Sequence, residues 1–291
     1  MITPVNQPPS FCYWAVPWFF LCSGVFFAHS LHKYAAVALI KNKAGGLLVP
    51  YLLWAGIGGL TVYSAIPEES WLCLDAVFAF CKMHPIGNGP LWYIRALMIF
   101  MTIGVGVKSL PLVCNAACIV IGVVLLQRVG VEVGPGSSPF YFALGMLISK
   151  SLLDGVLETK YVKMVCLVGF LVSFGLRVAW FGLGGSFAHQ GSNLLSNCSV
   201  VFMIVAFYEL SSLVARRVKS IPMMELVAGA TSFVYFTHMI FMRLLRRVFV
   251  CEANLLFLIL AGVTIVSMYG LAVLMKCYVP KLYLFCTGGR K

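Results

Sequence analysis

Charged side chains are scarce in this chain, and acidic ones are the scarcest. Only 10% of the 291 residues are charged and nine are Asp or Glu, whereas 61% are hydrophobic and the mean hydropathy is +0.97. Soluble domains are closer to half apolar and a quarter charged, so a soluble globular fold is excluded. A proton-coupled transporter usually carries Asp or Glu inside its spans, so the shortage of carboxylates argues against that class as well.

The cysteines lack the spacings of a metal site or of a disulfide framework. Eleven of them are scattered through apolar stretches, without a CxxC pair or a Cys/His block at zinc spacing. They are interpreted as small hydrophobic packing residues, and neither a metal nor a bound cofactor is expected. A secretory signal peptide is not indicated either, because the first apolar run has no basic segment before it and further runs follow.

Long apolar runs fill most of the sequence and predict membrane-spanning helices. A bilayer core about 30 Å thick needs roughly 20 apolar residues per helix, and backbone groups in lipid must pair within their own segment. Nine spans are predicted, at about 12–31, 47–66, 90–107, 111–129, 137–150, 162–182, 194–214, 226–247 and 254–276. Residues 71–81 are expected to form an interfacial helix, because Asp75 interrupts a short apolar stretch.

The whole chain is therefore predicted to be one all-α, polytopic membrane domain over residues 1–291. Its core covers about 12–276, and 277–291 is expected to be a cytoplasmic tail. The longest gap between spans, about 67–89, is too short for an independent soluble fold.

The positions of Lys and Arg predict the orientation. If the N-terminus lies outside, fourteen of them fall in inner gaps and five in outer gaps. Cytoplasmic loops are enriched in Lys and Arg, so the N-terminus is expected outside and the C-terminus in the cytoplasm. Lys33, Lys41 and Lys43 are interpreted as part of this signal, with attraction of an anionic substrate as the alternative. Since the net charge of +12 resides mostly in such gaps, no nucleic-acid partner is expected.

Five segments, taken in order, resemble the acyltransferase 3 family of integral membrane O-acyltransferases. They are AVPWFFLCSGVFF (15–27), KNKAGGLLVPYLLW (41–54), GPLWYIRALM (89–98), PFYFALGMLISK (139–150) and SFVYFTH (232–238). The resemblance implies transfer of an acyl group, commonly acetyl from cytoplasmic acyl-CoA, to a hydroxyl of a glycan or lipid-linked sugar. It also implies a bacterial cytoplasmic membrane. The alternative is a non-catalytic polysaccharide-export or interaction subunit with the same fold.

One departure from the family concerns its first helix. Family members normally open with a helix that carries a basic residue and, further on, a histidine that serves in catalysis. This chain starts at what looks like the second helix, after the loop-like residues MITPVNQPPS. No residue matches that histidine, so little or no acyl transfer by this chain alone is expected if the family's first helix is absent.

His238 is the one histidine of five that lies well inside a predicted span. Titratable groups within a bilayer are costly, so such a residue is a functional hypothesis by default. Tyr235 lies three residues earlier, on the same helical face. An imidazole beside a phenol can act as general base or acid on a sugar hydroxyl, so both are predicted to be catalytic. The structural alternative is a buried histidine bonded to backbone.

Arg95 lies about 8 Å inside the outer end of its span, at 1.5 Å per residue. Arginine binds phosphate or carboxylate through two parallel hydrogen bonds, so Arg95 is predicted to bind substrate. The alternative is a side chain that snorkels to the interface. Trp92 and Arg177 complete the predicted substrate-binding set, although Trp92 and Tyr93 also fit an interfacial aromatic belt.

Other polar residues near the predicted span ends have simpler interpretations. The outer arginines form either a cationic mouth together with Arg95 or anchors for helix ends in headgroups; they are Arg177, Arg243, Arg246 and Arg247. His29 and His32 are interpreted as interfacial rather than metal-binding. Gly24 is expected to let two helices approach closely, and the absence of a GxSxG elbow around Ser23 rejects a serine triad.

Overall fold

The computed structural model of the chain describes residues 15–63, 90–131, 133, 137–148, 222–248 and 254–289, together with scattered positions between 159 and 202. Every regular element among these residues is helical. The backbone contacts divide the chain into two compact units. Unit 1 comprises residues 1–32, 109–124 and 135–220, and unit 2 comprises residues 33–108, 125–134 and 221–291.

Unit 1 contains nearly all of α1 (Ala15–Lys33), most of α6 (Leu112–Arg128) and all of α7 (Ser138–Leu147). Helices α1 and α7 meet at two glycines, as expected for Gly24. A Cβ added to Gly24 would lie 2.1 Å from the Phe142 carbonyl oxygen, and one added to Gly145 would lie 2.1 Å from that of Leu21. Because neither glycine has a side chain, the two backbones pack directly against each other.

Unit 2 is built from the remaining helices. They are α2 (Ala36–Lys43), η2 (Ala44–Leu48), α3 (Val49–Tyr63), α5 (Leu91–Gly106), α11 (Pro222–Val248), α12 (Asn254–Tyr278) and α13 (Pro280–Thr287). η2 is a single π-helical stretch that joins α2 to α3 without a break. α11 and α12 form an antiparallel pair, because Thr231 bonds Tyr269 at 3.2 Å whereas Met242 accepts a hydrogen bond from Thr264 at 2.9 Å.

Seven of the nine predicted spans coincide with helices in the described part of the chain. The agreement is within two residues at both ends for 90–107 and 111–129, which are α5 and α6. Three predicted elements cannot be compared with the structure along their length, because they lie wholly or mostly outside the described residues. They are the spans 162–182 and 194–214 and the interfacial helix 71–81.

Two helical stretches of the described residues are long and apolar enough to cross a bilayer. They are Ala36–Gly59, which runs through α2, η2 and α3, and Ile259–Tyr278 in α12. The apolar helices Leu91–Gly106, Leu112–Arg128, Ser138–Leu147 and Ala230–Met242 are shorter. The all-helical fold is thus confirmed for the described residues, and the number of nine spans stays a prediction.

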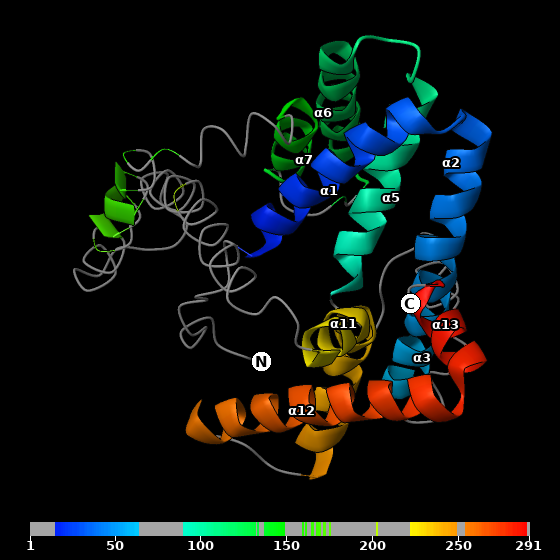
Figure 1. Cartoon of the computed structure of the whole chain (residues 1–291), viewed down its shortest axis with the longest axis vertical. Helices are drawn as coiled ribbons and strands as arrows, with labels where there is room; N and C mark the ends of the chain where they lie inside the picture. The colour runs from blue at the N-terminus through cyan, green and yellow to red at the C-terminus, as the bar shows by residue number, and fades with distance from the viewer. Residues whose placement is uncertain are drawn as a thin grey trace. The chain divides into compact units, whose positions relative to one another are not determined.

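The segment predicted as a tail contains a packed helix. α13 has Pro280 in its first turn and is followed by Gly288, whose φ of 69° is left-handed, and both residues are favoured at these positions. Tyr283 and Thr287 of this helix are 1% and 0% exposed. α13 lies beside α3 (Figure 1) and also contacts α11 and α12. The last helix therefore belongs to the core of unit 2.

Candidate functional site

The imidazole of His238 is held by its own helix, α11. Its Nδ1 lies 3.0 Å from the Val234 carbonyl oxygen and 2.9 Å from that of Tyr235. A carbonyl oxygen can only accept, so in the neutral ring Nδ1 carries the hydrogen and donates it. Nε2 then carries the lone pair that a general base needs. The backbone contact predicted as the structural alternative is thus present, and it also selects the tautomer that could remove a proton.

Tyr235 connects α11 to the start of α5. Its hydroxyl donates a hydrogen bond to the carbonyl oxygen of Pro90, the residue that precedes α5. The phenol ring also lies edge-on to Tyr93, with centroids 6.1 Å apart and planes at 72°. The His238 and Tyr235 rings are 6.2 Å apart, which agrees with their placement on one helical face.

Trp92 and Tyr93 extend this group of rings along the first turn of α5. Their centroids are 6.3 Å apart at 87°, the edge-to-face arrangement that aromatic pairs favour. The rings of Trp92, Tyr93, Tyr235 and His238 thus follow one another from α5 to α11 within unit 2. Trp92 is partly exposed at the end of this series, where an apolar ring face can contact a ligand.

Arg95 lies one turn further along α5 and is buried. Its side chain is 7% exposed, and its charge acts on the phenol of Tyr51, which is 1% exposed. A guanidinium that snorkelled to the membrane surface would be exposed. The burial therefore agrees with the interior placement that the substrate-binding hypothesis requires. α3 and α5 bring Tyr51 and Arg95 together, although they are far apart in the sequence.

The structure describes less of the other arginines that were predicted near the outer face. Arg177 lies outside the described residues. Arg243, Arg246 and Arg247 lie in the last turns of α11, and their side chains are outside the described part of the structure. The cationic mouth therefore stays a prediction. Among the described residues, no three His, Cys, Asp or Glu side chains gather as a metal site would require.

Two residues of this cluster were missed by sequence reasoning. Tyr51 and Pro90 lie in the segments KNKAGGLLVPYLLW and GPLWYIRALM, so they were near residues already singled out. Neither carries a charge, and an apolar helix gives no signal for which of its aromatic side chains meets an arginine on another helix. The fold supplies that information.

The apolar helices indicate a helical membrane protein, and the partly buried cluster of aromatic and polar side chains gives it a candidate site between α3, α5 and α11. The family model described as "Acyltransferase domain", of the acyltransferase 3 family, matches residues 2–275. The chain belongs to this family and is, in its general class, a membrane acyltransferase. No curated protein and no solved structure matches the chain significantly.

Proposed function

We propose that the protein transfers an acyl group, acetyl by resemblance to its family, from acyl-CoA to a hydroxyl of a cell-surface glycan or lipid-linked sugar. Membership of the acyltransferase family supports the reaction class. The observation that carries the proposal within this chain is the pair of contacts between Nδ1 of His238 and backbone carbonyl oxygens, which favours the tautomer that leaves Nε2 as a base.

In the proposed reaction, Nε2 of His238 removes the proton of the acceptor hydroxyl as its oxygen attacks the thioester carbonyl. The new C–O bond forms, the C–S bond breaks, and the proton passes from the imidazolium to the departing CoA thiolate. General-base catalysis of this kind contributes roughly 10²- to 10⁴-fold to the rate. No metal or bound cofactor is required for this balance of atoms and charge.

The remaining site residues have supporting roles in this proposal. Arg95 is assigned to anionic groups of the substrate or to negative charge that develops on the carbonyl oxygen, because a buried guanidinium interacts strongly with both. Trp92 is assigned to the apolar face of a sugar ring. Tyr235 is assigned as the phenol that positions α11 against α5 through Pro90. Arg177 is retained as a substrate-binding residue of the outer side.

The test is an acyl-transfer assay in membranes that contain the chain, with isotope-labelled acetyl-CoA and glycan acceptors. His238→Gln is expected to lower transfer by about 10²-fold or more, with expression unchanged. His32→Gln is the matched control, because His32 is an exposed histidine at the end of α1, and it should retain transfer. Equal activity of both variants would contradict the proposed base.

A second candidate is a non-catalytic export or interaction subunit of the same fold. It is favoured by one observation: the hydroxyl of Tyr235 and Nδ1 of His238 are already bonded within the protein. Under this function, His238→Ala and Arg95→Ala alter glycan export or complex assembly and leave the acyl content of the glycan unchanged. A glycan acylation profile of a deletion strain separates the two candidates.

A further inference from the structure

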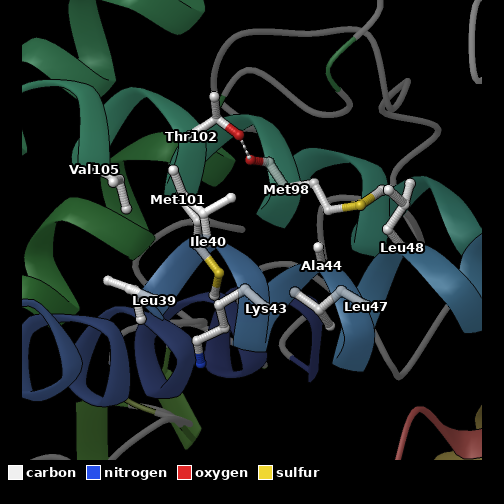
Figure 2. A pocket seen from close by; sticks show the side chains of 10 residues that line it. All are labelled: Leu39, Ile40, Lys43, Ala44, Leu47, Leu48, Met98, Met101, Thr102 and Val105. Atoms are coloured by element: carbon white, nitrogen blue, oxygen red, sulfur yellow. Dashed lines mark hydrogen bonds between the residues drawn. The ribbon is translucent and has the colours of Figure 1, made fainter. Parts of the chain in front are cut away.

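A pocket lies between the α2–η2 segment and the second half of α5, within unit 2. Its volume is about 200 Å³. Figure 2 shows the residues that line it: Leu39, Ile40, Lys43, Ala44, Leu47, Leu48, Met98, Met101, Thr102 and Val105. One end of the α2–α5 pair is fixed by Lys108, whose ammonium donates to the Tyr34 carbonyl oxygen.

The walls of this pocket are suited to hydrocarbon. Eight of the ten lining residues are apolar, and the polar ones are Lys43 and Thr102. The Thr102 hydroxyl already donates to the Met98 carbonyl oxygen at 2.8 Å (Figure 2). A ligand that placed amide groups against such walls would lose their hydrogen bonds to water without replacement. This argues against the amide-containing arm of CoA as the natural occupant.

The volume indicates the length of chain that fits. An apolar cavity of about 150 Å³ stays dry and binds benzene, so one of about 200 Å³ holds roughly eight hydrocarbon carbons. This is about half of a membrane lipid's acyl chain and far more than an acetyl group. The flexible side chains of Met98 and Met101 can adapt to an alkyl chain.

The charge beside the pocket indicates the head group. Lys41 and Lys43 occupy the last turn of α2, within the apolar stretch Ala36–Gly59. In Figure 2 the Lys43 ammonium points away from Thr102 and α5, so the stem of this side chain forms the wall. Basic residues near a bilayer surface attract anionic lipid headgroups, and of these two lysines only Lys43 lines the pocket.

From these features we propose that the pocket between α2, η2 and α5 binds one acyl chain of an anionic phospholipid from the surrounding bilayer. The lipid phosphate binds the ammonium of Lys43, and the half of the acyl chain nearest the head group packs against Met98 and Met101. This is a structural lipid site, and it does not depend on the acyl-transfer reaction proposed above.

The experiment uses the full chain in nanodiscs with photoactivatable phosphatidylglycerol or phosphatidylcholine that carries a diazirine in the acyl chain. Labelled peptides are identified by mass spectrometry. The anionic probe is expected to label residues 39–48 and 98–105 more strongly than the zwitterionic probe, by about fivefold. Equal labelling by the two lipids would overturn the assignment of the head group.

Two pairs of variants make the test specific. Ala44→Trp fills the pocket and should abolish labelling, whereas Ala38→Trp on the same helix is exposed and should not. Lys43→Gln should remove the preference for the anionic probe, whereas Lys41→Gln, exposed and not a lining residue, should keep it. Retained labelling in Ala44→Trp would overturn the proposal. Displacement of the lipid probe by octanoyl-CoA would also overturn it and would make the pocket an acyl-donor site.

Discussion

The indole N–H of Trp54 donates a hydrogen bond of 2.9 Å to the carbonyl oxygen of Cys286, a residue 232 positions later in the chain. Around this bond, the Trp54 ring lies edge-on to Phe233 at 5.8 Å, and Phe233 lies 6.1 Å from Tyr283. α3, α11 and α13 thus share one aromatic core, and two of these helices, α3 and α11, carry Tyr51 and His238.

Replacement of Trp54 by Phe should release α13. The variant keeps an aromatic ring but leaves the buried Cys286 carbonyl without this donor, which costs about 1–3 kcal/mol. We expect a lower thermal midpoint and faster alkylation of the Cys286 thiol. Trp18→Phe in α1 is the control for loss of an indole in unit 1. If alkylation of Cys286 in Trp54→Phe matched that of the unaltered protein, the bond would have no role in docking α13.

The thiol of Cys286 should respond to pH differently from an ordinary cysteine. Burial raises its pKa above the usual value, so the reactive thiolate forms only at higher pH. Because the folded state favours the neutral thiol, the associated stability is present below the ordinary pKa and is lost as pH rises through the raised one. Labelling rates for each cysteine, measured by mass spectrometry across pH, should show Cys286 rising at higher pH in the folded protein than after denaturation. Coincident curves would contradict this.

Gly288 and Gly289 offer a matched pair of substitutions. Both have left-handed backbones, with φ of 69° and 78°, so alanine strains each by a similar amount. A Cβ at Gly288 would lie 2.6 Å from the Gly46 carbonyl oxygen, whereas one at Gly289 would meet nothing within 4 Å. Gly288→Ala should therefore lower stability by about 1–3 kcal/mol more than Gly289→Ala. Equal thermal midpoints would show that α13 does not pack on η2 in this way.

The contact between α1 and α7 should be as sensitive to an added methyl group as the contact at Gly288. Gly24→Ala places a methyl group 2.1 Å from the Phe142 carbonyl oxygen, so the helices must separate at a cost of about 1–3 kcal/mol or more. Gly56→Ala in α3 meets nothing within 4 Å and should be neutral or slightly stabilising, since alanine favours helix by about 1 kcal/mol. A denaturation series in detergent compares the two. A stable Gly24→Ala variant would rule out the backbone contact.

Tyr235→Phe tests whether this phenol positions the site or transfers a proton. Loss of the hydrogen bond to Pro90 should reduce acyl transfer by about fivefold, as expected for a net change near 1 kcal/mol. The pH profile of kcat should keep its shape, because His238 remains the base. A changed profile would assign the proton to Tyr235 instead.

The sequence predicted the apolar helices well because their signal is local. About 20 apolar residues in lipid have few alternatives to a helix, and the bounds of α5 and α6 follow within two residues. α2 lies in the gap left between the predicted spans 12–31 and 47–66, yet it continues through η2 into α3. Lys41 and Lys43 do not end the helix, so charged residues between two apolar runs are a poor guide to helix ends.

The site was predictable only in part, since its chemistry depends on contacts between helices. His238 and Tyr235 share a face through simple helical spacing, and this could be read from residues 232–238. The bond from Tyr235 to Pro90 and the approach of Tyr51 to Arg95 each join residues from separate segments. α13, in contrast, had a local signal that was not used, namely Pro280 at its start and Gly288 at its end.

The link between Trp54 and Cys286 also bears on the order of assembly during synthesis. α3 leaves the ribosome more than two hundred residues before α13. The indole N–H of Trp54 therefore bonds water or another group until Cys286 has been synthesised. A bulky fusion placed directly after Gly289 would hinder the docking of α13 on α3. A cleavable tag, or one on a long linker, is therefore the safer choice for producing the protein.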